Sequence, residues 1–325
     1  METICNSLLK LGYTVWNAIV GELAWGLFKQ NPKAAFTNEY EISFYMDVVR
    51  KVFNAMKDIM VPLLLLFFVI KTFKELITTP WEQFYKKIIY SVLHFFVISF
   101  ICFNLWTING VFIDCTQAVA NSMFKGLEGY HEDDVVHPKP KPKPGESGDE
   151  PDVADESIDI AGVDIQMSFE DNNDPTLSAA CEELDGCNFL ERAIGYVLIM
   201  LACAGAALAW SSSAIMILKA AYTRLIQPLI MLPFAGIAVA MSAGTENMGR
   251  TTYAFYKQIA IFILAGPFMA LCCAAAKFMT IAIDPASDAS ALTKALLMIA
   301  TVIIRPMIIA GLVKGASQTI QQFSS

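Results

Sequence analysis

Charge is scarce in this chain. Only 17% of its 325 residues are charged, whereas a soluble domain has roughly 25%. Histidine is scarcer still, and its three residues, His94, His131 and His137, stand at no metal-ligand spacing from the thiols. The motifs of phosphate loops, zinc proteases and serine hydrolases are absent. These absences argue against a soluble fold, an ATPase, a metalloprotease and a hydrolase, and we expect neither an enzyme nor a cofactor nor a bound metal.

Long apolar runs dominate what is present, since 55% of the residues are hydrophobic. A helix needs roughly 20 apolar residues to cross the hydrocarbon core of a bilayer, which is about 30 Å thick. Five segments meet that length: 52–73, 88–110, 193–218, 259–283 and 292–313. The sequence therefore predicts an all-α, polytopic membrane protein with five spans.

A sixth apolar run, 225–242, is shorter and contains Pro228, Pro233 and Gly236. Prolines and glycines weaken backbone pairing in lipid unless neighbouring protein restores it. This segment is therefore predicted either as a sixth span or as a re-entrant hairpin.

Acidic residues are concentrated between Lys125 and Glu191, which hold 19 of the 31 acidic residues and 4 of the 23 basic ones. Basic residues prefer short cytoplasmic loops, and four lysines lie around the connection between the first two spans: Lys71, Lys74, Lys86 and Lys87. This pattern places the acidic segment outside the cytoplasm, with five spans, the N-terminus outside and the C-terminus inside. Three cations at the beginning of the first span oppose this orientation: Arg50, Lys51 and Lys57.

These features divide the chain into five parts: an N-terminal amphipathic or interfacial region (1–50), the first two spans (51–112), an exported acidic loop (113–191), a C-terminal bundle of spans (192–315) and a short tail (316–325). Within the loop, the alternation of proline with lysine at 137–145 favours an extended polyproline II segment. The acidic residues around it bury too little apolar surface to fold alone, so 130–175 is predicted to be disordered.

Apolar residues recur at helical spacing within the first 28 residues: Ile4, Leu8, Leu11, Val15 and Ile19. Such spacing predicts an amphipathic helix. The helix either lies in the membrane interface or packs on the other spans.

Four of the eight cysteines lie inside apolar runs, where a thiol behaves as a small hydrophobe: Cys102, Cys203, Cys272 and Cys273. Cys181 and Cys187 lie near the end of the acidic segment. If that segment faces an oxidising exterior, these two are candidates for a disulfide.

Small residues recur at four-residue spacing in three places: Gly205, Ala209 and Ser213; Gly236, Ala240 and Gly244; and Gly266, Ala270 and Ala274. In lipid, such stripes let helix backbones approach closely. They predict tight packing, either within the chain or at a seam between copies of a homo-oligomer.

Three ionisable residues fall at membrane depth: Arg305, Lys277 and His94. A charge there is costly unless it faces protein or water, so Arg305 marks either a polar pathway or a structural pair. Lys277 lies towards the end of its span, from which its side chain can reach the interface. His94 is expected to form hydrogen bonds between helices rather than to act as a base.

A basic, proline-bearing connection precedes the last two spans. It reads KAAYTRLIQPLIMLPFAG at 219–236 and continues through MGR at 248–250 and YKQ at 256–258 into an apolar helix. This pattern resembles the TrbL-like polytopic subunit of type IV secretion (conjugative transfer) channels. The resemblance covers residues 45–315 in the order of segments and 215–260 in residue pattern, and it carries no catalytic residue over to this chain.

The resemblance implies a channel and scaffold subunit in the bacterial plasma (inner) membrane that helps to move a DNA–protein or protein substrate across it. Other channel subunits, partner ATPases and membrane lipid are its implied partners. An acidic loop would repel DNA phosphates, so contact with the translocated substrate is expected to be indirect. The alternative is a secondary transporter or permease, a class in which paired interrupted helices are common. Here 225–242 is the one clearly interrupted run.

Overall fold

The computed structural model describes residues 2–37, 43–128, 175–185, 188–244, 248–278 and 291–323. These residues are almost entirely helical and contain no strand, with one isolated bridge between Thr37 and Ser43. The elements are α1 (Glu2–Trp16), η1 (Asn17–Ala24), α2 (Trp25–Lys29), η2 (Pro32–Ala34), η3 (Tyr45–Val49), α3 (Arg50–Thr78), α4 (Trp81–Phe103), α5 (Leu105–Glu128), α7 (Pro175–Asp185), α8 (Phe189–Met231), η5 (Leu232–Phe234), α9 (Ala235–Ser242), α10 (Met248–Phe278) and α11 (Ala291–Phe323).

Five helical segments are long and apolar enough to cross a membrane, which confirms the predicted helical membrane class: Tyr45–Thr78, Tyr85–Phe103, Phe189–Ser242, Arg250–Ala275 and Leu292–Ala316. Helices suit this setting because each satisfies its backbone hydrogen bonds internally. The segment Arg250–Ala275 is the most buried of the five. Its helix, α10, contacts α5, α8, α9 and α11.

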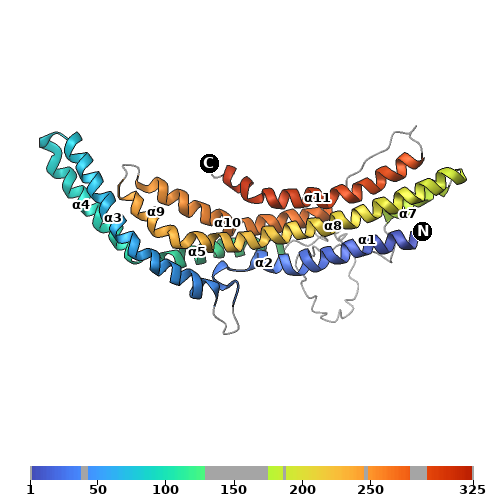
Figure 1. Ribbon diagram of the computed structural model, residues 1–325, viewed down its shortest axis with the longest axis horizontal. Helices are drawn as coiled ribbons and strands as arrows, with labels where there is room; N and C mark the ends of the chain where they lie inside the picture. Colours follow the sequence, from blue (N-terminus) through green and yellow to red (C-terminus); the bar gives the residue numbers. More distant parts are fainter. Residues whose placement is uncertain are drawn as a thin grey trace, which may run out of the picture.

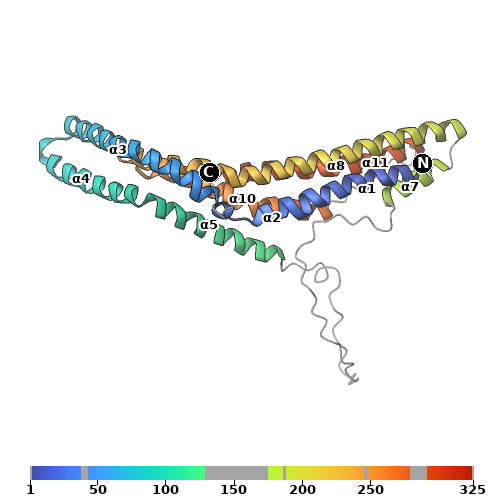
Figure 2. The ribbon, with the colours of Figure 1, turned by 60° about the horizontal axis from the view of Figure 1, so that its bottom comes forward.

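The helices lie side by side along one long axis, so the molecule is elongated (Figure 1). The central rod is α8, which packs against both α1 and α11. The α3–α4 hairpin lies at one end of the molecule, and the N-terminus and α7 lie at the other (Figures 1 and 2).

The proline-bearing run 225–242 continues α8 rather than forming a separate element. Helix α8 passes through Pro228, a short 3-10 turn begins beside Pro233, and α9 follows directly. Proline removes one backbone donor and bends a helix, but here the chain keeps its helical path. The predicted sixth span or hairpin is therefore the distal part of one helical path of 54 residues.

The second predicted span, 88–110, is divided between two helices. Helix α4 ends at Phe103, Asn104 forms a turn, and α5 begins at Leu105. The Asn104 side chain donates a hydrogen bond to the Phe100 carbonyl over 2.9 Å, a local bond that competes with regular helix.

The acidic segment is helical at both of its described ends. Helix α5 continues to Glu128, so residues 113–128, predicted as the start of a loop, are helical. Helix α7, Pro175–Asp185, lies at the other end. The predictions of polyproline II at 137–145 and of disorder at 130–175 fall almost wholly outside the described residues and stay predictions.

The N-terminal helix consists of α1, η1 and α2, and it packs along α8. Packing on another helix was one of the two settings predicted for it. Its buried residues are Cys5, Leu9, Trp16, Val20, Ala24 and Phe28. The predicted stripe is only partly covered, since Ile4 and Leu11 are 53% and 60% exposed and its other three residues are half-buried. From Asn17 to Ala24 the helix has π geometry, whose wider turn keeps residues four apart on the packed face.

Candidate functional site

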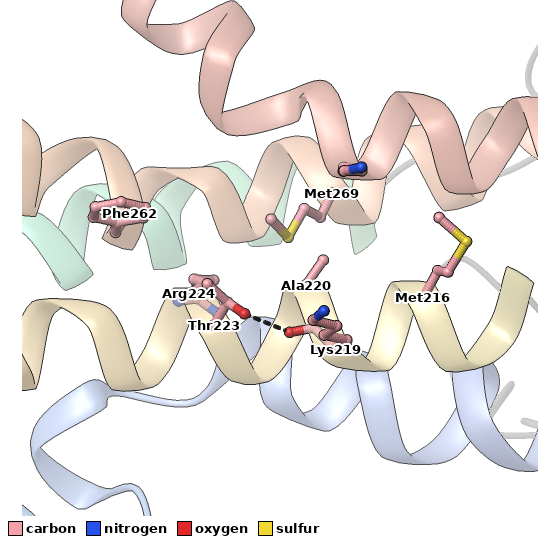
Figure 3. Close-up of a pocket in the computed structure, with 8 residues that line it drawn as sticks. Met216, Lys219, Ala220, Thr223, Arg224, Phe262 and Met269 are labelled. Carbon is pink, nitrogen blue, oxygen red and sulfur yellow. Dashed lines mark hydrogen bonds between the residues drawn. The ribbon is translucent and has the colours of Figure 1, made fainter.

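A cavity of about 290 Å³ opens between α8, α10 and α11. Its lining residues are Met216, Lys219, Ala220, Thr223, Arg224, Phe262, Met269 and Lys314 (Figure 3). Three of these eight are cations and none is acidic. This cavity is the candidate functional site, and it is called the basic pocket below.

Arg224 is the buried member of the basic pocket, with 1% of its surface exposed. Its Nη1 donates to the carbonyls of Leu27, over 2.8 Å, and of Phe28. Its Nη2 donates to the Gln30 carbonyl over 3.5 Å, and its Nε to the Ile263 carbonyl over 3.3 Å. A cation at a helix C-terminus satisfies the last carbonyls and the helix dipole, so Arg224 caps α2.

Gly266 on α10 makes room for this cap. A Cβ atom on Gly266 would lie 2.5 Å from Cζ of Arg224 and 2.6 Å from the Phe28 carbonyl oxygen. The stripe of Gly266, Ala270 and Ala274 was predicted to permit close packing, and both alanines are buried in the same core as Phe28. Close approach within the chain is therefore confirmed for this stripe.

The basic pocket is electropositive because its charges are not balanced by carboxylates. Lys219 and Lys314 have exposed side chains, and neither forms an ion pair within the described part of the chain. The hydrogen bonds of Arg224 within the described residues all go to backbone carbonyl groups, and arginine stays protonated in proteins. The Thr223 hydroxyl donates to the Lys219 carbonyl over 2.8 Å (Figure 3).

A second group of polar side chains lies where α3, α4 and α9 meet. Lys71 is 5% exposed, and its Nζ lies 3.9 Å from Oε1 of Glu75. Oε2 of Glu75 accepts a hydrogen bond of 2.6 Å from the Ser91 hydroxyl. His94 interacts with both charged residues and with the backbone of Ser242. We call these five residues the α3–α4 polar cluster.

His94 lies on α4, and its Nε2 atom is buried with no hydrogen-bond partner among the residues described, so its predicted role between helices stays a prediction. Lys71 was predicted to belong to the connection between the first two spans, and its pairing with Glu75 was not predicted. The signal was available, because residues four apart lie on one face of a helix.

The other two predicted ionisable residues come from α10 and α11. Arg305 lies on α11, where its side chain is half-buried and makes contacts. Lys277 belongs to α10, but its side chain lies outside the described residues. The choice between a polar pathway and a structural pair at Arg305 stays a prediction.

The stripe on α9 is a close-packing surface against α3. A Cβ atom on Gly236 would lie 2.6 Å from Sδ of Met60, and one on Gly244 would lie 3.1 Å from Cβ of Phe67. Ala240 between them is fully buried. Tight packing within the chain is confirmed here as well.

The stripe on α8 behaves differently. A Cβ atom on Gly205 would meet nothing within 4 Å, and Ala209 is half-buried, although Ser213 is buried. The close approach of α1 to α8 occurs instead at Gly12, whose added Cβ would lie 2.9 Å from Cα of Ala207.

The cysteines in apolar runs are packing residues, since Cys102, Cys203 and Cys273 are buried and Cys272 is half-buried. Cys181 is buried on α7, whereas Cys187 lies outside the described residues, so their disulfide stays a prediction. Within the described ranges, no group of three His, Cys, Asp or Glu side chains is arranged to hold a metal ion.

The five apolar helices and their packing define a multi-pass helical membrane protein. No protein-family model, curated protein or solved structure matches the chain.

Proposed function

We propose that this protein is a non-enzymatic channel and scaffold subunit of a type IV secretion (conjugative DNA transfer) apparatus in the bacterial plasma membrane. The proposal rests on the resemblance of residues 215–260 to TrbL-like subunits. The structural observation that supports it most is the helical path from Phe189 to Ser242.

That path is far longer than a bilayer is thick. Helix α8 alone has 43 residues and extends about 65 Å at 1.5 Å per residue, against a hydrocarbon core of about 30 Å. Each helix of a transporter needs to be only slightly longer than the membrane is thick. A rod of this length, reinforced by α1 and α11 along its sides, suits a subunit that links the membrane to other parts of an assembly.

The α3–α4 hairpin offers apolar surface outside the core of the molecule. Phe73, Phe96 and Phe100 are large and exposed, and they contact lipid or neighbouring subunits when the protein is in a membrane. In this proposal other channel subunits and further copies of the chain occupy part of this surface. Partner ATPases supply the energy, and the acidic segment lies outside the cytoplasm, where it repels DNA rather than binding it.

Gene deletion tests the proposal directly. A deletion strain should lose conjugative transfer of a marked plasmid, and the wild-type gene supplied in trans should restore it. Purification of the tagged protein should bring along a coupling ATPase and a secretion ATPase. Normal transfer from the deletion strain would reject the proposal, whatever proteins are co-purified.

The α3–α4 polar cluster favours a second candidate, a secondary transporter or permease. Ionisable residues that meet within apolar spans are typical of proton-coupled carriers, and Lys71, Glu75 and His94 meet in this way. Under this alternative, Glu75→Gln would abolish proton-coupled solute uptake by proteoliposomes and leave plasmid transfer unchanged. Under the leading proposal, proteoliposomes show no such uptake with either protein.

A further inference from the structure

We propose that the basic pocket binds the phosphate-bearing headgroup of an anionic phospholipid. The inference goes beyond the proposed function and does not depend on it. It starts from the charges: Lys219, Arg224 and Lys314 line one cavity that has no acidic residue in its lining. Like charges held close together repel each other, and an anion between them removes that repulsion.

Arg224 adds a fixed, preformed donor to this site. It uses four N–H groups on the carbonyls of α2 and α10, and a guanidinium has five. Its place is set by the protein core, whereas Lys219 and Lys314 are exposed and can turn towards a ligand. A buried, hydrogen-bonded arginine flanked by two exposed lysines is well suited to phosphate.

The remaining lining distinguishes a lipid from a free anion. Met216, Phe262 and Met269 bring apolar surface to the same cavity, and methionine adapts readily to irregular apolar groups. A site for inorganic phosphate has no use for this surface. An amphiphile uses both parts, with its phosphate at the cations and the start of its acyl chains over the apolar side chains.

The place of the two pocket lysines agrees with this assignment. Lys314 lies two residues before Ala316, where the apolar segment of α11 ends, and Lys219 directly follows the predicted span 193–218. Lipid headgroups lie at the level where spanning segments end. Basic pockets between membrane helices at this level are typical sites for anionic headgroups.

The test uses the full-length protein, purified in an uncharged detergent, and follows thermal unfolding as lipid is added. Phosphatidylglycerol, the anionic probe, should raise the melting temperature in a saturable way, and phosphatidylcholine should not. A ligand that binds the folded state raises stability according to its affinity, so the titration yields a dissociation constant. Lys219→Gln and Lys314→Gln should each weaken the affinity for phosphatidylglycerol about fivefold.

The control variant is Lys86→Gln, which removes an exposed cation from α4, a helix that contributes nothing to the pocket. It should bind phosphatidylglycerol like the wild type, and Lys219→Arg should retain binding as well. Both pocket lysines are exposed, so the melting temperature without lipid should stay unchanged and report intact folding.

Two results would overturn the proposal. Equal affinities in Lys86→Gln and the two pocket variants would show that the lipid either responds to overall charge or binds away from the pocket. The same stabilisation by inorganic phosphate as by phosphatidylglycerol would show a free-anion site instead of a lipid site.

Discussion

Nη1 of Arg224 donates a hydrogen bond of 2.8 Å to the carbonyl of Leu27, a residue 197 positions earlier in the chain. The bond joins the C-terminal part of α8 to the end of α2, and Gly266 on α10 provides the space for it. The N-terminal helix is thereby tied to the helices that form the basic pocket.

Replacing Arg224 should release this end of the N-terminal helix. In Arg224→Met the stem is kept but the carbonyls of Leu27 and Phe28 lose their donor, and hydrogen bonds from a charged group are worth about 1.5–3 kcal/mol each. We expect a loss of about 3 kcal/mol in the free energy of unfolding and faster hydrogen exchange in residues 17–29.

The matched control is Arg192→Met, which removes an exposed arginine from the same helix. It should leave hydrogen exchange in residues 17–29 as in the wild type. If residues 17–29 exchange hydrogen as slowly in Arg224→Met as in the wild type, apolar packing alone holds the N-terminal helix.

Replacing a glycine by alanine should have opposite effects at Gly266, where an added Cβ meets close neighbours, and at Gly205, where it meets open space. Gly266→Ala forces Arg224 or the Phe28 carbonyl to move, so it should destabilise the protein by about 1–3 kcal/mol. Gly205→Ala meets nothing within 4 Å and should raise stability by up to about 1 kcal/mol through the better helix propensity of alanine. Chemical unfolding in detergent compares the two, and equal effects would contradict the close approach at Gly266.

The Ser91–Glu75 hydrogen bond should stabilise the α3–α4 hairpin. Ser91→Ala should lower the free energy of unfolding by about 2 kcal/mol, because the bond is made to a carboxylate. In a Glu75→Ala background the same change should cost much less, as a double-mutant cycle measures. Ser122→Ala, which removes only a bond to the Ala118 carbonyl within α5, is the control and should stay within about 0.5 kcal/mol.

The proposed orientation predicts which side of the membrane each segment faces. In a variant with Cys115 and Cys187 replaced by serine, a membrane-impermeant thiol reagent applied to intact cells should label Ser147→Cys and spare Gly249→Cys. Inverted vesicles should reverse the pattern. Labelling of both positions in intact cells would reject the arrangement of five spans with the acidic segment outside.

Features that depend on local composition were predictable. The apolar runs led to the five candidate spans, and the small residues at 236–244 and 266–274 led to close packing, because both rules need just the spacing of residues along one helix. The end of α4 at Phe103 was missed, because an apolar run around a single asparagine does not reveal a turn.

The basic pocket could be predicted in part. The predicted basic connection contains Lys219 and Arg224. Lys314 comes from α11, about 90 positions later in the sequence, and no pattern along one helix indicates that the three residues meet. The α3–α4 polar cluster could not be predicted as a whole, because its residues come from three helices and no pattern along one helix shows that they meet.

The sequence by itself determined that this chain forms apolar helices, because a backbone in lipid must satisfy its own hydrogen bonds and a span needs a set length of apolar side chains. Tertiary structure alone decided which face of each helix is buried. The N-terminal helix carries apolar residues on two faces, and packing against α8, together with the π geometry of residues 17–24, selected the face of Trp16 and Phe28 over that of Ile4 and Leu11. Partners of Arg224 likewise exist only after folding, since they lie nearly 200 residues away or on another helix.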